Sequence, residues 1–196
     1  MTDILTRVTF LMSVRGFKAF LLLGAAAGII IAVTACAGEA SQEGLAPEFA
    51  LSATDGTTIR LTRVLAERDA IIIVFYKGFS CVICLDWLVE LQEAYPFFRQ
   101  RNAELVAIST DDIPQTVRTV GVTLARYPVL ADREGEVSKS YKVYDVDGDG
   151  RAALAMFVIG PGREILWQQV GWEPGEEPSL DEVLVLLDTM SVPITE

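Results

Sequence analysis

Residues 71–91 read IIIVFYKGFSCVICLDWLVEL, and this stretch decides the fold. It begins with six consecutive apolar residues, Ile71–Tyr76, mostly β-branched or aromatic, which is typical of a strand buried on both faces. A four-residue turn follows. From Cys81 to about Arg101, apolar residues then recur every three or four positions, at Leu85, Leu88, Leu91 and Tyr95. The stretch therefore predicts a buried strand that leads through a short turn into a helix.

Two cysteines, Cys81 and Cys84, open this predicted helix. Cysteines three positions apart face the same side of a helix, close enough for a disulfide. In the first turn, unpaired backbone N–H groups and the helix dipole stabilise a thiolate, and Lys77 is a nearby cation that adds to this effect. We therefore predict that the pair cycles between dithiol and disulfide. The alternatives are a purely structural disulfide and half of a zinc site, although the only other cysteine is Cys36.

The composition of the 196-residue chain excludes several classes of function. Because the chain has no histidine, it cannot build a Ser-His-Asp triad, a Cys-His protease site or a histidine-ligated metal or haem site. Its net charge is −11, from 16 Lys and Arg against 27 Asp and Glu, whereas a nucleic-acid partner requires a basic face. We expect no nucleic-acid partner, no cofactor and no metal at the catalytic site, which leaves thiol chemistry.

The rest of the chain predicts an α/β domain built on the same strand and helix. Strand–helix–strand units followed by a hairpin indicate a mixed sheet, with parallel and antiparallel strands, flanked by helices. The expected strands are a hairpin over 49–61 around Asp55-Gly56, then 105–110, a short extended piece at 127–130, and a second hairpin of 155–160 with 164–170. The expected helices are 61–66, 113–121, 134–141 and 180–190.

The first 35 residues have the order of an export signal, with basic residues ahead of an uncharged segment, Ala19–Ala35. The segment ends in Val33-Thr34-Ala35-Cys36, which resembles the bacterial lipobox and implies cleavage before Cys36 and lipidation of its sulfur. The alternative is an uncleaved anchor helix, at the short end of what spans a bilayer. Both interpretations place the rest of the chain on the extracytoplasmic face of a bacterial cell envelope, attached to the membrane.

These observations divide the chain into three parts. Residues 1–35 are the predicted signal peptide or membrane anchor. Residues 36–45 are small and polar after the cysteine, without an apolar period, and are typical of a tether. Residues 46–196 are the predicted folded domain.

An acidic stretch, Asp145-Val-Asp-Gly-Asp-Gly150, fits the first six positions of a calcium-binding loop. The twelfth position is Met156, so the bidentate acid of such a loop is absent. Asp and Gly also favour turns for their own conformational reasons. Weak calcium binding and a plain polar turn both remain open.

Five short motifs in order resemble the redoxins, the alkyl hydroperoxide reductase and thiol-specific antioxidant (peroxiredoxin-like) family of the thioredoxin superfamily. They are Ala46-Pro47-Glu48-Phe49, Asp55-Gly56-Thr57, the segment FYKGFSCVIC, LVAISTDD at 105–112 and YPVLADREGEVSKSYKVYD at 127–145. The resemblance runs from about Ala46 to Gln169. It implies a thioredoxin-like fold and a redox-active cysteine pair.

The resemblance implies two different assignments of roles. By comparison with thioredoxins, Cys81 is the exposed nucleophile and Cys84 the buried resolving cysteine. By comparison with peroxiredoxins, Cys84 attacks the peroxide and Cys81 stands where that family has a threonine; the Ser80 hydroxyl is one residue away from this position.

The position of the thioredoxin cis-proline, or of the peroxiredoxin arginine, is occupied here by Leu154. Arg151, three residues earlier, reaches the site only if its loop bends inward. The departure weakens both comparisons at the place where a substrate docks.

The sequence as a whole predicts a membrane-anchored, extracytoplasmic thiol–disulfide oxidoreductase that uses Cys81 and Cys84. The alternatives are a thiol-dependent peroxidase and a non-catalytic binding module with a structural disulfide. The expected partners are protein thiols or disulfides, or peroxides, together with an electron donor that the sequence does not identify.

Overall fold

The computed structural model describes residues 44–172 and 176–190. The predicted signal or anchor, the predicted lipidation site Cys36 and the tether up to residue 43 lie outside these ranges. Within the two ranges, no helix combines the length and the apolar character needed to cross a membrane.

The described residues form one mixed sheet with the strand order β2-β1-β5-β4-β3-β6-β7. Its central strands β3, β4 and β5 are parallel, and the other neighbours are antiparallel. The strands are β1 (Ala50–Ala53), β2 (Thr58–Arg60), β3 (Ala70–Phe75), β4 (Ala103–Ser109), β5 (Val129–Ala131), β6 (Ala155–Ile159) and β7 (Ile165–Val170). The helices are α1 (Leu61–Leu65), α2 (Val82–Gln100), α3 (Ile113–Thr123), α4 (Glu136–Ser140) and α5 (Leu180–Met190).

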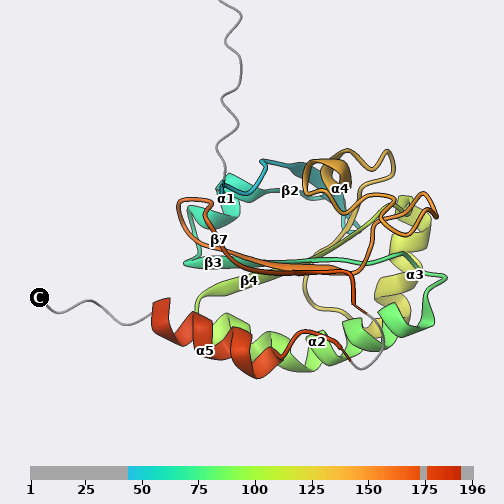
Figure 1. Cartoon of the computed structure of the whole chain (residues 1–196). Coiled ribbons are helices and arrows are strands. Elements are labelled where there is room, and N and C mark those ends of the chain that lie inside the picture. Colours follow the sequence, from blue (N-terminus) through green and yellow to red (C-terminus); the bar gives the residue numbers. More distant parts are fainter. Residues whose placement is uncertain (1–43, 173–175, 191–196) are drawn as a thin grey trace, which may run out of the picture. The chain divides into compact units, whose positions relative to one another are not determined.

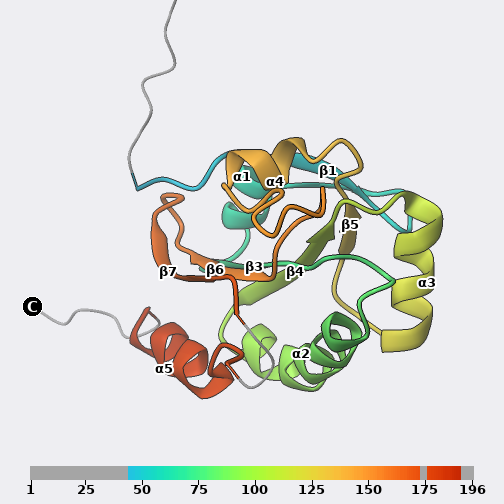
Figure 2. The same cartoon turned by 45° about the vertical axis from the view of Figure 1, so that its right-hand side comes forward.

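Strand β3 is the centre of two hydrophobic cores because alternate side chains of a strand point to opposite faces. Ala70, Ile72 and Val74 pack into the core beneath α2 and α5, whereas Ile71, Ile73 and Phe75 pack into the core that includes residues of α1 and α4. Figures 1 and 2 show α2 and α5 on one face of the sheet and α1 and α4 on the other. The prediction of a strand buried on both faces is confirmed, since all six residues of β3 are buried.

The predicted elements all form, and their ends shift by only a few residues. The helix predicted over 134–141 is shortened at both ends, to α4 (Glu136–Ser140). Gly135, just before it, has a left-handed backbone with φ +68°. The buried Asp132 carboxylate accepts the N–H groups of Val137 and Ser138, so the first turn is fixed by a residue outside the helix.

Candidate active site

The turn between β3 and α2 presents the cysteine pair, and a carboxylate from the neighbouring strand end holds it. Gly78 has φ +117°, and a Cβ built there would lie 2.6 Å from the Asp111 carboxylate. The same carboxylate accepts the Phe79 N–H at 2.6 Å. The Cys81 N–H then donates to the Gly78 carbonyl at 3.1 Å, which brings Cys81 to the start of α2. Gly78 is therefore the residue type that this close approach requires.

Cys81 and Cys84 form a disulfide, with their Cα atoms 5.2 Å apart. Cys81 is the N-cap of α2, and its sulfur accepts the Cys84 N–H at 3.3 Å. Its side chain is half-buried, whereas Cys84 is 0% exposed. The two sulfurs therefore differ in access: only Cys81 is open to a partner in this conformation.

A cavity of about 290 Å³ opens beside Cys81. It combines apolar groups with charged groups, so it has the mixed character of a small docking site. Ile83, in the first turn of α2, is 46% exposed and extends this apolar surface next to the disulfide. The lining residues are Lys77, Cys81, Ile83, Asp147, Leu154, Gly171, Trp172 and Glu176.

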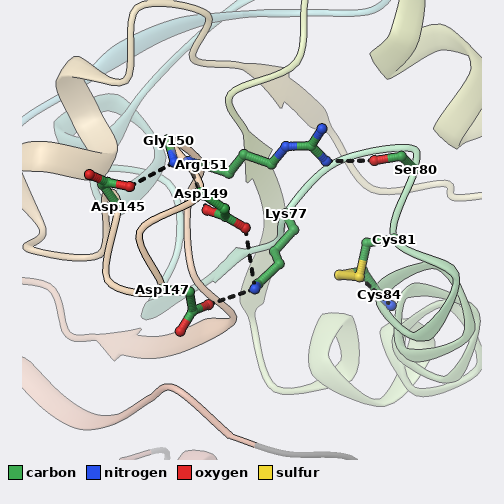
Figure 3. Close-up of polar contacts among 9 residues, drawn as sticks. All are labelled: Lys77, Ser80, Cys81, Cys84, Asp145, Asp147, Asp149, Gly150 and Arg151. Carbon is green, nitrogen blue, oxygen red and sulfur yellow. Dashed lines mark hydrogen bonds and ion pairs between the residues drawn. A yellow bond between two sulfur atoms is a disulfide. The ribbon is translucent and has the colours of Figure 1, made fainter.

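Lys77, the cation predicted to stabilise the thiolate, does line this cavity, but its charge is already paired. Its Nζ lies 2.6 Å from a carboxylate oxygen of Asp147 and 3.4 Å from one of Asp149 (Figure 3). The hydrogen bond to Asp147 raises the pKa of Lys77 above its ordinary value, against a smaller opposing effect of burial. Lys77 therefore stays protonated, but two carboxylates compete for its charge.

Arg151 does reach the cysteine turn. Its guanidinium donates to the Ser80 hydroxyl at 2.5 Å, so the structure brings together two of the three supporting residues that the sequence singled out (Figure 3). Ser80 itself is exposed and precedes Cys81 directly. The contact of Arg151 with Ser80 places a second cation next to the cysteine turn, and Arg151 comes from the same loop as Asp147 and Asp149 (Figure 3).

Leu154, which the sequence resemblance equates with the thioredoxin cis-proline, lines the cavity with Cys81. Its carbonyl accepts the Gly171 N–H at 2.8 Å. The described part of the chain contains no cis peptide bond. This wall of the cavity is therefore an aliphatic side chain, in place of the proline ring expected from thioredoxins.

The stretch Asp145–Gly150 forms a compact turn between α4 and β6. The Asp145 carboxylate accepts the Gly150 N–H at 2.7 Å, and an isolated bridge joins Tyr144 to Ala152 at the base of the turn. The other two acids, Asp147 and Asp149, hold Lys77. Within residues 44–172 and 176–190, no cluster of three or more acids or cysteines is arranged to hold a metal ion. Residues 145–150 thus form a polar turn whose acidic side chains bond to its own backbone and to Lys77.

Three residues that contact the candidate site were not predicted from the sequence to do so: Asp111, Asp147 and Asp149. Asp111 follows β4, the parallel neighbour of β3, and the carboxyl ends of parallel strands share one edge of a sheet; this placement was a usable signal. From the sequence, Asp147 and Asp149 were interpreted as calcium ligands or as residues of a plain polar turn. Nothing in their spacing points to Lys77, because that contact depends on the path of the turn that carries them.

Two buried tryptophans, Trp87 and Trp172, belong to the same hydrophobic core as Cys84. The rings of Trp87 in α2 and Trp172 after β7 meet edge to face, with centroids 6.4 Å apart. Trp172 also lines the cavity. Trp87 and Trp172 are therefore packing residues of this core, and Trp167 is half-buried against it.

Comparison with known proteins yields a consistent set of matches. The model of the AhpC/TSA family matches residues 43–168. YkuU of Bacillus subtilis is 27% identical over 106 residues, covering 50% of this chain and 58% of that protein. Peroxiredoxin 2 of Picrophilus torridus is 24% identical, covering 71% and 70%. Thiol-disulfide oxidoreductase ResA of Bacillus thuringiensis is 26% identical, covering 54% and 64%.

Solved structures agree on the fold. The peroxidoxin BcpB of Mycobacterium tuberculosis superposes with a TM-score of 0.66 at 23% identity, covering 76% of this chain and 96% of that one. Peroxiredoxin Q of Xanthomonas campestris gives a TM-score of 0.62 at 18% identity, covering 72% and 90%. The thioredoxin-like mixed sheet flanked by helices, expected from the sequence, is confirmed.

Proposed function

The chain belongs to the AhpC/TSA family, and from this premise we propose that it is a thiol–disulfide oxidoreductase in which Cys81 attacks and Cys84 resolves. Thiol-dependent redox chemistry is common to the family match and to the named relatives. The observation that supports the exchange reaction is the difference in access between the two sulfurs. Cys81 opens into the cavity at the start of α2, whereas Cys84 is fully buried.

The reaction passes two electrons from the protein dithiol to a substrate disulfide. The Cys81 thiolate attacks one substrate sulfur, which forms a mixed disulfide and releases the other substrate sulfur as a thiolate. The Cys84 thiolate then attacks the Cys81 sulfur. This step restores the intramolecular disulfide of the structure and releases the second substrate thiol. A dithiol reductant returns the protein to its reduced form by the reverse sequence.

The helix start favours Cys81 as the attacking group. In the disulfide, the Cys84 N–H already points at the Cys81 sulfur, at 3.3 Å. After reduction, the same donor and the positive end of the α2 dipole stabilise a thiolate at that position. Cys84 becomes nucleophilic only toward a sulfur that is already bonded to Cys81, because its own sulfur is buried.

A thiol peroxidase is the second candidate, and the contact of Arg151 with Ser80 favours it. A guanidinium beside the cysteine turn is suited to hold a peroxide oxygen by hydrogen bonds. In this reaction the Cys84 thiolate would attack the peroxide, forming a sulfenic acid and releasing an alcohol or water. The Cys81 thiol would then condense with the sulfenic acid, releasing water and forming the same disulfide.

The two reactions, and the redox-silent binding module, are separated by one comparison on the full chain in detergent. The Cys36→Ser background leaves only the two thiols of the pair. The reduced protein is mixed separately with hydrogen peroxide and with oxidised insulin, and the loss of thiols is followed in time. Fast exchange with insulin and slow reaction with peroxide are expected. Rapid sulfenic acid at Cys84 would establish the peroxidase instead. A pair that dithiothreitol does not reduce would leave only the binding module.

We propose further that the domain is held at the extracytoplasmic face of a bacterial membrane by lipid on Cys36. The support is the apolar segment 19–35 followed by the lipobox-like Val33-Thr34-Ala35-Cys36. Expression in a bacterium fed labelled palmitate tests this proposal. We expect label on the native chain, a shortened N-terminus, and neither in the Cys36→Ser variant. An unlabelled, full-length chain that stays in the membrane would identify an uncleaved anchor.

A further inference from the structure

One turn of the chain, residues 145–150, places two carboxylates beside the cysteine pair, and the proposed reaction gives them no role. We refer to this turn as the acidic loop. Asp147 and Asp149 both contact the Lys77 ammonium, at 2.6 and 3.4 Å. The loop is held in shape by its own backbone: the Arg151 N–H donates to the Asp149 carboxylate at 3.1 Å, and the Asp145 N–H to the Arg151 carbonyl at 2.7 Å. The carboxylates therefore belong to an organised turn.

Lys77 lies between this loop and the cysteines. Figure 3 shows its side chain with the ammonium turned toward Asp147 and Asp149, and with the disulfide on its other side. Lys77, Asp147 and Cys81 line the same cavity. Two other charged groups face this region: Glu176, which lines the cavity, and Arg151, whose guanidinium donates a hydrogen bond to Ser80. The electrostatic field at the Cys81 sulfur receives contributions from these five charged side chains and from the start of α2. Asp111, which accepts the Phe79 N–H, and Arg118, over the Phe79 ring, add two further charges from α3 and the end of β4.

The pairing changes what Lys77 does to the sulfur. An unpaired ammonium close to a thiol favours the thiolate and lowers the pKa of that thiol. An ammonium in contact with one or two carboxylates presents a field that largely cancels at a third group. The Lys77 side chain is 29% exposed, so solvent does not screen this cavity completely. The acidic loop thus opposes the stabilisation of the Cys81 thiolate that was predicted for Lys77.

We propose, resting on the exchange function above, that Asp147 and Asp149 are positioning residues that hold Lys77 off the Cys81 sulfur and so moderate its reactivity. A lower Cys81 pKa stabilises the reduced protein and makes the disulfide a stronger oxidant. The acidic loop therefore biases the pair toward reducing substrate disulfides. Removing the loop's charges shifts the pair toward oxidising substrate dithiols to disulfides.

The proposal is tested by removing either the two carboxylates or the ammonium, because the two changes are expected to shift the Cys81 pKa in opposite directions. In the full chain carrying Cys36→Ser, the rate of iodoacetamide alkylation at Cys81 is measured against pH, and the modified cysteine is identified by mass spectrometry. Asp147→Asn/Asp149→Asn should lower the Cys81 pKa by about half a unit to one unit. Lys77→Met should raise it by a similar amount, and the triple variant should return close to the parent.

The matched control removes the same charge elsewhere. Asp55→Asn/Glu67→Gln deletes two exposed carboxylates that do not line the cavity, and it should leave the Cys81 pKa unchanged. The single Asp149→Asn variant removes the longer contact only and provides the test if the double variant does not fold. Equal pKa values in the parent, Lys77→Met and Asp147→Asn/Asp149→Asn would overturn the proposal.

Insulin reduction by the same proteins separates this proposal from the function on which it rests. Opposite pKa shifts without exchange in any variant would leave the loop's role intact and refute the oxidoreductase. Insulin reduction by the parent, with the same Cys81 pKa in every variant, would support the oxidoreductase and refute the role of the acidic loop.

Discussion

Gly78 is the residue on which the geometry of the cysteine turn depends most. Its left-handed φ and its close approach to the Asp111 carboxylate leave no room for a side chain. Through Asp111 and the Phe79 N–H, this one position fixes where the polypeptide leaves β3 and where Cys81 begins α2. The reactivity of Cys81 therefore depends on a residue that carries no chemistry of its own.

Gly78→Ala is expected to lower the free energy of unfolding by about 1–3 kcal/mol from backbone strain alone, and further through the clash with Asp111. Gly56→Ala is the matched control, since Gly56 also has a positive φ, +83°, but nothing lies within 4 Å of the place that its Cβ would take. It should cost about 1 kcal/mol. Urea unfolding of the oxidised protein measures both. Equal losses would mean that the contact with Asp111 carries no weight.

At the level of elements, the short helix α4 depends on one buried carboxylate. Asp132, 3% exposed at the end of β5, accepts the N–H groups of Val137 and Ser138 and the Ser138 hydroxyl. Five residues form too short a helix to be stable by themselves. The turn from β5 into α4 is thus fixed by side-chain hydrogen bonds.

Asp132→Ala should lower the free energy of unfolding by about 3 kcal/mol, because it leaves three buried donors without an acceptor. Asp112→Ala removes a carboxylate that caps α3 by accepting the Gln115 N–H at 3.0 Å, but at an exposed position. Its expected cost is about 1 kcal/mol. Urea midpoints at fixed m-value compare the two substitutions. A loss at Asp132 no larger than that at Asp112 would contradict the assignment.

Elements governed by side-chain periodicity were predictable from the sequence. Ile71–Tyr76 and the Leu85, Leu88, Leu91 repeat give β3 and α2 because burial follows a regular spacing. The helix predicted over 134–141 was too long, because its start is fixed by Asp132 through space and by the φ of Gly135. Neither influence is periodic, so no pattern in the sequence reveals it.

In the candidate site too, features that follow a local sequence pattern were predictable, whereas contacts between distant parts of the chain were not. The disulfide of Cys81 with Cys84 was predictable because the two residues lie three positions apart at the start of a helix. The pairing of Lys77 with Asp147 and Asp149 was not, because it joins residues about seventy positions apart through a turn whose path the sequence leaves open. That Arg151 reaches the site was predicted only on the condition that the same turn bends inward, and its contact with Ser80 was not predicted.

Buried tyrosines should make the whole domain sensitive to alkali. Burial raises the pKa of Tyr76, Tyr95, Tyr127 and Tyr141 above the ordinary value near 10. Above that pH the unfolded chain loses phenolic protons that the folded domain retains. The folded state then binds more protons, and stability falls as pH rises. The raised pKa of Lys77 acts in the same direction.

We therefore expect the urea midpoint to fall steeply between about pH 10 and pH 12, with phenolate absorbance appearing together with unfolding. Tyr127→Phe should reduce the steepness, because it removes one of these protons along with the hydrogen bond to the Leu88 carbonyl. Phenols that titrate near pH 10 while the protein remains folded would be inconsistent with their burial.

The most direct test of the central proposal is which single cysteine captures a disulfide. Reduced Cys84→Ser and Cys81→Ser variants of the full chain, each carrying Cys36→Ser, are mixed with an excess of 5,5′-dithiobis(2-nitrobenzoate). The mixed disulfide is then followed in time by released thiolate and by mass. We predict at least tenfold faster capture at Cys81, in the Cys84→Ser variant, because its sulfur is accessible at the start of α2. Faster capture at Cys84 would contradict the assignment of Cys81 as the nucleophile.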